Sequence, residues 1–200
     1  MAEGEKVRRP GGRSARVQAA VHAAVTELVA ERGYGNFTIA EVAARAGVAD
    51  TSVYRRWGDL ETLSAEVVSS WLTTHASMPD TGSLEGDLQA YAAGVADDIL
   101  GPQGLAVLRL LIALSSGGEP GLRARDAFVA GRRIQLQEML DRAAARGEQV
   151  PPGLSVVDFI LAPLYIRVLF GMPLPAADVR TQVARLLADA QGKGAPSSPG

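Results

Sequence analysis

Apolar residues recur along most of this 200-residue chain at the three- and four-residue spacing of one helix face. From Ser14 to Arg32 this spacing is continuous, and Gly33 follows as a stop. No segment convincingly shows the two-residue alternation of a strand, so the pattern predicts an all-α fold. The further helices that we expect lie at residues 38–46, 50–57, 60–75, 84–100, 102–116, 120–146, 155–170 and 176–190.

Signals for helix ends are clearest between residues 38 and 59. Thr38 and Glu41 have the T-x-x-E spacing of a capping box, and Gly47 stands where a left-handed C-cap is expected. Gly58 breaks the next helix, and Asp59 can cap the one that follows. Two short helices joined by a Gly-containing turn predict a helix-turn-helix.

The stretch "SMPDTGS" (77–83) is a polar break and a candidate hinge between two units. We therefore predict a flexible basic arm at 1–13 and a helix-turn-helix DNA-binding domain at 14–58. A helical ligand-binding and dimerisation domain follows at 59–190, and a disordered tail at 191–200.

Charge is distributed unevenly along the chain. Residues 1–57 hold nine Lys and Arg against six Asp and Glu, a balance of +3. The remainder holds eleven against sixteen, a balance of −5, and the two sum to the net −2. A basic N-terminal portion on an acidic remainder favours nucleic-acid contact at one end.

Catalysis finds little support in the composition. The chain lacks cysteine, which excludes disulfides, thiolate zinc sites and cysteine nucleophiles. The two histidines do not form a His-x-x-x-His pair, and neither a phosphate-binding glycine loop nor a Gly-x-Ser-x-Gly elbow occurs. We expect no enzyme, metal or cofactor. The apolar runs are too short to span a bilayer, and the start is not a secretory signal, so we expect a cytoplasmic protein without membrane contact.

The helix at 50–57 is the candidate recognition element. Val53 of this helix and Val42 and Ala43 of the preceding helix are expected to form the small core between the two helices. Arginine suits the paired acceptors of guanine, and hydroxyl groups suit phosphate oxygens. A plain helical hairpin with solvated charges is the alternative. The residues left on or near the outward face are Asp50, Thr51, Ser52, Tyr54, Arg55 and Arg56.

From Val17 to Leu63 the chain resembles the TetR family of bacterial transcription regulators. The similarity lies in "ELVAERGYGNFTIAEVAARAGV", in Ser52-Val53-Tyr54, in Trp57 and in the Glu61–Leu63 ending. It implies three DNA-binding helices and a fourth that leads to a ligand-binding, dimerising domain. The DNA contacts that it implies are Thr38, Thr51, Ser52, Tyr54, Arg55 and Arg56, with Arg13 and other cations of the arm.

Three positions depart from the family pattern. Ala49 stands where Ser or Thr usually caps the recognition helix, so Asp50 is expected to take over that role. Thr51 stands where Gly is common, and Leu60 where a lysine usually touches phosphate. These changes imply weaker DNA affinity and leave the expected fold unchanged.

The stretch "DFILAPLYIRVLFGMPL" resembles a phrase in one subgroup of TetR-type C-terminal domains. Helix 155–170 is apolar nearly all round, which one subunit cannot easily cover, and helix 176–190 adds an apolar stripe. We therefore expect a homodimer; simple core packing is the alternative. The predicted dimerisation residues are Phe159, Tyr165, Leu169, Val183 and Leu187.

An effector pocket is harder to predict. Arg109 lies in the apolar run "LAVLRLLIAL", and a buried arginine needs an anionic partner from the protein or a ligand. Snorkelling to solvent, or pairing with an aspartate, is the alternative. Aromatic residues at helical spacing can also be plain core filling. The candidate ligand-binding residues are Trp71, His75, Tyr91, Arg109, Phe128 and Tyr165.

These features together predict a one-component transcriptional regulator, and we expect a repressor. A homodimer would bind a palindromic operator in double-stranded DNA, and a small-molecule effector would release it. The alternative is a helical small-molecule-binding or protein-interaction dimer whose DNA-binding end is weakened.

Overall fold

The computed structural model describes residues 12–74 and 78–193, and within these ranges every regular element is helical, as predicted. Most of the observed helices agree with the predicted ones within two residues at each end. None of the described helices is both long and apolar enough to cross a lipid bilayer. The elements are α1 (Gly12–Arg32), α2 (Ile39–Ala46), α3 (Asp50–Trp57), α4 (Leu60–Thr74), α5 (Leu84–Leu100), α6 (Pro102–Leu114), α7 (Glu119–Ala145), α8 (Gly153–Val156), the π-helical turn η1 (Val157–Leu161), α9 (Ala162–Leu169) and α10 (Ala176–Lys193).

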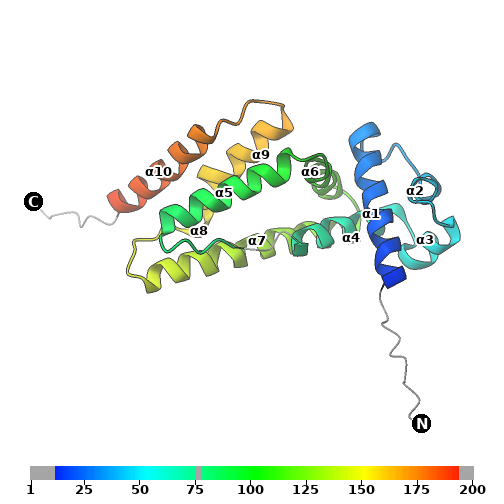
Figure 1. The fold of residues 1–200 in the computed structure, drawn as a ribbon, viewed down its shortest axis with the longest axis horizontal. Helices are drawn as coiled ribbons and strands as arrows, with labels where there is room; N and C mark the ends of the chain where they lie inside the picture. The colour runs from blue at the N-terminus through cyan, green and yellow to red at the C-terminus, as the bar shows by residue number, and fades with distance from the viewer. Residues whose placement is uncertain (1–11, 75–77, 194–200) are drawn as a thin grey trace, which may run out of the picture.

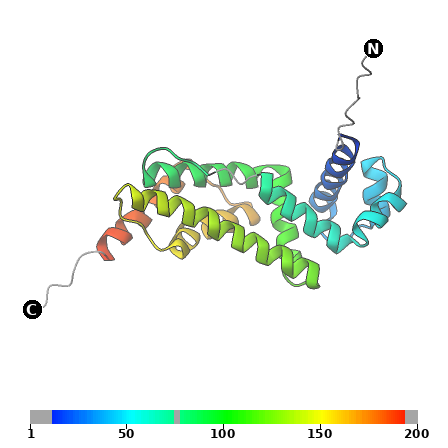
Figure 2. The ribbon, with the colours of Figure 1, turned by 90° about the horizontal axis from the view of Figure 1, so that it is seen from below.

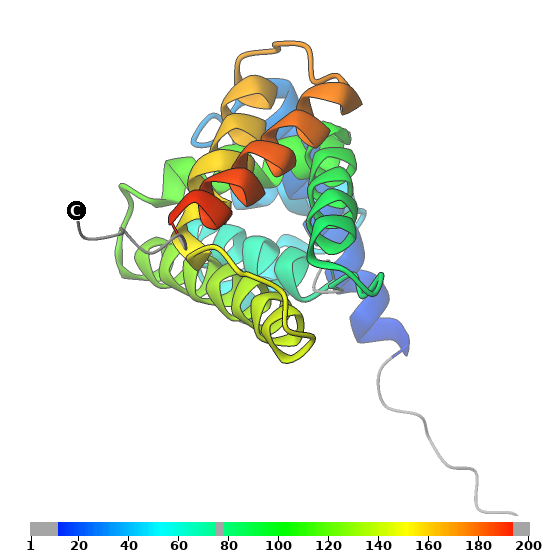
Figure 3. The same ribbon diagram turned by 90° about the vertical axis from the view of Figure 1, so that its left-hand side faces the viewer.

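The molecule is elongated, with α1, α2 and α3 gathered at one end (Figure 1). Helix α4 leads from that end into a bundle formed by the later helices (Figure 2). Seen along the long axis, α5, α7, α9 and α10 surround the middle of the bundle (Figure 3). This arrangement separates a small terminal unit from a larger helical body.

The predicted helix ends are confirmed. Thr38 and Glu41 form a complete capping box at the start of α2, and Gly47 ends that helix in the left-handed conformation. Asp59 accepts a hydrogen bond from the Thr62 backbone N–H at 2.7 Å and so caps α4. These local signals position α2 and α3 as a helix-turn-helix.

Two hydrophobic cores hold the fold together. The first core joins α1–α4 to the inner faces of α6 and α7, so it is not confined to the predicted DNA-binding domain. The second core lies among α5, the later part of α7, and the last helices. Gly104 permits a close crossing of α5 and α6, because a Cβ atom there would lie 1.9 Å from the Asp98 carbonyl oxygen.

The single helix predicted at 155–170 is interrupted by a π-helical turn. The Ala162 N–H bonds to the Val157 oxygen, five residues back, and Pro163 follows without an N–H of its own. Helix α10 also runs to Lys193, past the predicted end at 190. The rest of the predicted tail and residues 1–11 of the predicted arm lie outside the described residues.

The predicted hinge is anchored to the bundle where the structure describes it. Asp87 is 0% exposed, and its carboxylate accepts hydrogen bonds from the Thr81 N–H at 2.6 Å and the Thr81 hydroxyl at 2.8 Å. Arg146, just after α7, completes the site with an ion pair to Asp87 at 3.2 Å. Segment 78–83 is therefore fixed to the bundle rather than a free linker.

Candidate functional site

Helix α3 begins with an unusual cap. Ala49, its N-cap residue, supplies no side-chain hydrogen bond. The Asp50 carboxylate accepts the Thr51 backbone N–H at 2.6 Å instead, as the sequence predicted. The helix therefore starts with an exposed negative charge at the end where DNA contacts are expected.

The side chains of α3 divide between core and solvent. Val53 and Trp57 are buried in the first core, four residues apart, and anchor the helix. Tyr54 is 49% exposed, Thr51 is exposed, and Ser52 is half-buried. At the start of α2, the exposed Thr38 donates its hydroxyl to Glu41. The polar residues predicted to contact DNA are thus accessible, except that nothing can be placed for the Arg13 side chain, which lies outside the described residues.

The two adjacent arginines of α3 have different surroundings. The Arg56 guanidinium lies 4.6 Å from the centre of the Trp57 ring and 3.7 Å from Glu66 of α4. Arg55 is exposed and forms no ion pair with any described residue. Arg55 is therefore the freer cation for an outside partner, while Arg56 is partly engaged within the protein.

Glu66 also connects α4 to α1. It accepts a hydrogen bond from the Gln18 amide at 2.7 Å and lies 3.2 Å from the His22 ring. Burial lowers the pKa of His22, although the Glu66 carboxylate acts in the opposite direction. The His22 imidazole thus packs between α1 and α4 as part of the contact between these helices.

A hollow of about 350 Å³ lies between the start of α1 and α3. Ser14, Ser52 and Arg55 contribute polar groups to it. Hydroxyls beside a guanidinium suit a phosphate oxygen. The full lining is Ser14, Val17, Ser52, Val53, Arg55, Arg56 and Trp57.

Glu61 makes a contact that sequence reasoning missed. Its carboxylate, at the start of α4, accepts the Gly121 backbone N–H in the first turn of α7 at 3.1 Å. A Cβ atom at Gly121 would lie 2.9 Å from Glu61 and 2.6 Å from the Leu114 oxygen. The paired glycines of "SSGGEPG" were the available signal, since such runs often mark a close approach.

Several of the predicted pocket residues come together inside the bundle. Trp71 of α4, Phe128 of α7 and Tyr165 of α9 line one small cavity of about 10 Å³. Such a space holds about one water molecule at most. Tyr91 lies beside the same group through Arg132, and His75 falls outside the described residues.

The buried cation of this cluster is Arg132. Only 6% of Arg132 is exposed, and its guanidinium faces the rings of Phe128 and Tyr91 at 5.5 and 5.9 Å. Arg109, the arginine predicted for the pocket, is exposed on α6 and does not line the cavity, so we do not place it in the site. Arg132 escaped prediction because α7 carries charges along most of its length.

The tyrosines near Arg132 are neutral phenols. Burial raises the pKa of Tyr91 to about 12, although the charge of Arg132 opposes the rise. Burial likewise raises the pKa of Tyr165, against the same opposing charge. Neither hydroxyl supplies a negative charge to Arg132 near neutral pH.

The predicted dimerisation residues do not share one environment. Val183 is 0% exposed and belongs to the second core, so it is not available to a partner, whereas Tyr165 is half-buried and lines the small cavity. Leu169 and Leu187 are half-buried, and Phe159 is exposed. Ile166 and Phe170 of the predicted apolar helix are exposed, and Leu154 and Met172 add exposed apolar side chains nearby that the sequence did not single out.

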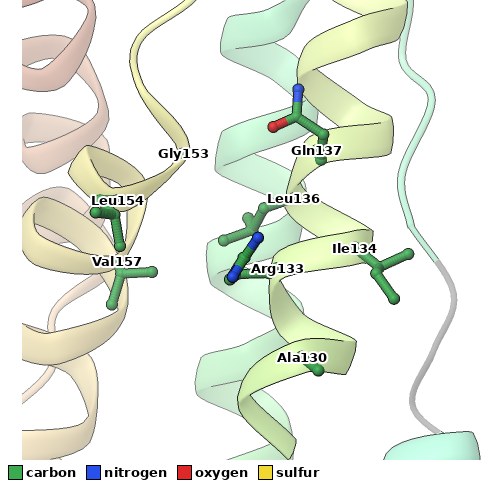
Figure 4. Close-up of a pocket in the computed structure, with 8 residues that line it drawn as sticks. All are labelled: Ala130, Arg133, Ile134, Leu136, Gln137, Gly153, Leu154 and Val157. Atoms are coloured by element: carbon green, nitrogen blue, oxygen red, sulfur yellow. The ribbon is translucent and has the colours of Figure 1, made fainter. Parts of the chain in front are cut away.

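An open groove of about 620 Å³ runs between α7 and the α8–η1 segment (Figure 4). Leu154 and Val157 face α7 across it, and Arg133 extends from α7 into the gap. Exposed apolar surface thus continues from η1 towards α7.

Two family descriptions match the chain. Residues 21–67 match "Bacterial regulatory proteins, tetR family", and residues 78–186 match "Tetracyclin repressor-like, C-terminal domain". The second match alone spans more than half of the chain. The helix-turn-helix end therefore matches the N-terminal domain of TetR family proteins, and the bundle matches their C-terminal domain.

Curated relatives and solved structures agree. The chain is 30% identical to the HTH-type transcriptional regulator AqdR of Rhodococcus erythropolis over 68% of its own length and 65% of the relative, slightly under two thirds. It is 26% identical to YdeS of Bacillus subtilis, an uncharacterised HTH-type regulator, over 75% of this chain and 77% of the relative. The TetR family regulator SCO0332 superposes with a TM-score of 0.62 at 27% identity, covering 86% of this chain and 97% of the other. A Rhodococcus sp. Rha1 regulator reaches 0.67 at 17% identity over 86% and 96%, which shows the shared fold.

Proposed function

Because the chain belongs to the TetR family of transcriptional regulators, we propose that it is a repressor that binds a roughly palindromic operator as a homodimer. A small-molecule effector, bound in the helical bundle, releases it. DNA binding would place its action in the bacterial cytoplasm.

DNA binding is supported above all by the two faces of α3, one buried in the first core and the other exposed to solvent. Two buried anchors hold the helix in the first core, and Thr51, Tyr54 and Arg55 remain accessible beside a polar hollow. A recognition helix needs such a fixed base and free side chains to enter the major groove. Arg55 is the candidate base reader, and Arg56 is the candidate phosphate contact because Glu66 and Trp57 restrain it.

Exposed apolar side chains of the last helices support the dimer. Ile166 of α9 is 51% exposed, Phe170 directly after that helix is 75% exposed, and Phe159 of η1 is exposed as well. A cluster of exposed large apolar residues usually marks an interface. A two-fold dimer built on this surface would present two copies of α3 to two half-sites of DNA.

Helix α4 offers a physical connection between effector and DNA. Trp71 near its end lines the internal cavity, and Glu66 near its middle contacts both α1 and Arg56 of α3. An effector that binds better when α4 is displaced would favour a spacing of the recognition helices unsuited to the operator.

The test begins with the duplexes that the purified chain selects from a genomic pool. Binding of the selected duplex is then measured by fluorescence anisotropy for the parent, for Arg55→Ala, and for Arg185→Ala as a control on exposed α10. We expect Arg55→Ala to weaken binding by roughly 1–3 kcal/mol with relaxed specificity at one base position, and the control to bind like the parent. Equal binding by all three proteins would reject α3 as the recognition helix.

Sedimentation tests the dimer. Phe170→Glu is expected to yield monomers, whereas Ile112→Glu, at an exposed apolar position of α6, should leave the dimer intact. A dimer in both variants would place the interface elsewhere. The alternative function is a ligand-binding or protein-interaction dimer. A chain that stays dimeric but shows no salt-dependent binding to any duplex would favour it. The acidic start of α3 and the leucine at position 60, where a lysine usually stands, also favour this alternative.

A further inference from the structure

Arg132 lies inside the bundle and forms no ion pair with a described carboxylate. The two hydrogen-bond acceptors that Arg132 has among the described residues are the Tyr91 hydroxyl at 3.4 Å and the Gln135 side-chain oxygen at 3.2 Å, both neutral. The Arg132 Nε–H is buried and has no hydrogen-bond partner there. A buried cation in this condition is costly unless something else neutralises it.

A second buried polar group, the Tyr165 hydroxyl, lies near Arg132. Arg132 is close enough to Tyr165 to oppose the rise in its pKa, but the buried hydroxyl makes no hydrogen bond of normal geometry to any described residue. Tyr165 and Phe128 line the small cavity, and the Arg132 guanidinium lies 5.5 Å from the centre of the Phe128 ring. The remaining walls of that cavity are apolar or aromatic: Trp71, Ile99, Gly104, Val107 and Leu108.

We infer that Arg132 is the anion-binding residue of the effector site, and that the effector is an apolar monocarboxylic acid. This inference rests on the proposed function, whose effector it characterises. A carboxylate can accept from Nε–H and Nη–H of one guanidinium side by side, and Tyr165 can donate to it. The apolar body of the acid then occupies the cavity.

The charge balance favours a monocarboxylate over a phosphate. The cluster offers one guanidinium and neutral phenols, so a dianion would leave a second charge buried without a partner. An amine would place a second cation beside Arg132. A neutral amide would leave the charge of Arg132 unmatched.

Entry requires a local opening, since the cavity is smaller than any such acid. Trp71 and Val107 are walls of the cavity and also of an open groove of about 260 Å³ between α1, α4 and α6. Movement of the Trp71 side chain would join the two spaces. The acid would then meet α4, the helix that reaches the DNA-binding end.

The test is a thermal-shift and calorimetric titration of the full chain, without DNA, using octanoate and phenylacetate with the matching primary amides. We expect at least one acid at saturating concentration to raise the melting temperature by roughly 5–10 °C, and the amides to have little effect. Arg132→Met should abolish the response to the acid, while Arg109→Met, the same substitution at an exposed site, should retain it. Arg132→Lys should retain part of it.

Fold loss and site loss can be separated. Because its charge is unpaired, Arg132→Met should melt without ligand at or above the temperature of the parent. Equal shifts by acids and amides, an undiminished acid response in Arg132→Met, or no binding of either acid at millimolar concentration would overturn the inference. If Arg132→Met is unfolded, acid binding by Arg132→Lys decides: no loss of affinity relative to the parent overturns it, and weaker binding supports it. Failure of DNA binding would reject the proposed function without changing these titrations.

Discussion

The two ends of this molecule use charged side chains in opposite ways. At the helix-turn-helix end, Arg55 is exposed, and the first core beneath α3 is built mainly of apolar side chains. In the bundle, Asp87 and Arg132 are buried, one satisfied by hydrogen bonds and an ion pair, the other without a carboxylate partner among the described residues. A charged side chain is therefore a candidate contact for an outside partner when it is exposed to solvent, as Arg55 is, or buried without a carboxylate among the described residues, as Arg132 is.

Removal of the buried Asp87 carboxylate should have the largest effect on the free energy of unfolding. Asp87→Ala removes the acceptor that holds Thr81 and leaves Arg146 without its buried partner, so unfolding should become easier by about 3–5 kcal/mol. Asp126→Ala, which breaks an exposed pair with Arg125, should change stability by about 0–1 kcal/mol. Urea denaturation measures both. Similar changes in unfolding free energy for Asp87→Ala and Asp126→Ala would show that the buried ion pair stabilises the fold no more than the exposed one.

Asp87 also predicts a pH dependence. Burial alone would raise its pKa, but hydrogen bonds from Thr81 and the neighbouring Arg146 hold that pKa below its ordinary value. A carboxyl group with a lowered folded-state pKa stabilises the fold above its unfolded-state pKa, and this contribution is lost as the pH falls further. Melting temperature should therefore fall on acidification more steeply in the parent than in Asp87→Ala.

Packing in the bundle is tested by two glycines of the crossing helices. Gly104→Ala places a methyl group against the α5 backbone and should destabilise the chain by about 3 kcal/mol. Gly94, inside α5, has no neighbour within 4 Å of a built Cβ, so Gly94→Ala should stabilise by about 0.5–1 kcal/mol. Opposite signs in thermal melts are the expected result; stabilisation of similar size in both would show that helix propensity, and not the close crossing at Gly104, decides the outcome.

Sequence patterns predicted the helices well and the interior charges poorly. The capping box and the left-handed glycine specify the bounds of α2 and α3 locally. Helical periodicity then predicts that Val53 points into the core and that Arg55 points to solvent. The run around Arg109 is apolar on almost every side, so its pattern does not indicate which face meets solvent. Arg132 and Arg133 are adjacent on a charged helix, and only the packing of α7 decides that the first is buried. Long-range contacts such as Glu61 with Gly121 leave no periodic signal at all.

Glu61 joins the two regions and gives an intermediate effect. Glu61→Ala removes a charged acceptor from the start of α7, which should cost about 1.5 kcal/mol of stability. Hydrogen exchange at the Gly121 amide should accelerate as its partner is lost. Glu119→Ala, in the same helix turn but highly exposed, should change neither quantity appreciably. Unchanged exchange at Gly121 in Glu61→Ala would show that the contact does not hold the two regions together.

The smallest effect concerns the acid at the start of α3. Asp50→Asn keeps a side-chain oxygen for the Thr51 N–H but removes a negative charge near the expected phosphates. Affinity for the selected duplex should rise about threefold at low salt, and the gain should shrink as salt screens the charge. Asp126→Asn, on α7 in the bundle, is the control and should not change affinity. If Asp50→Asn binds no better than the parent, the carboxylate lies away from the phosphates, and α3 must approach DNA through its middle rather than its first turn.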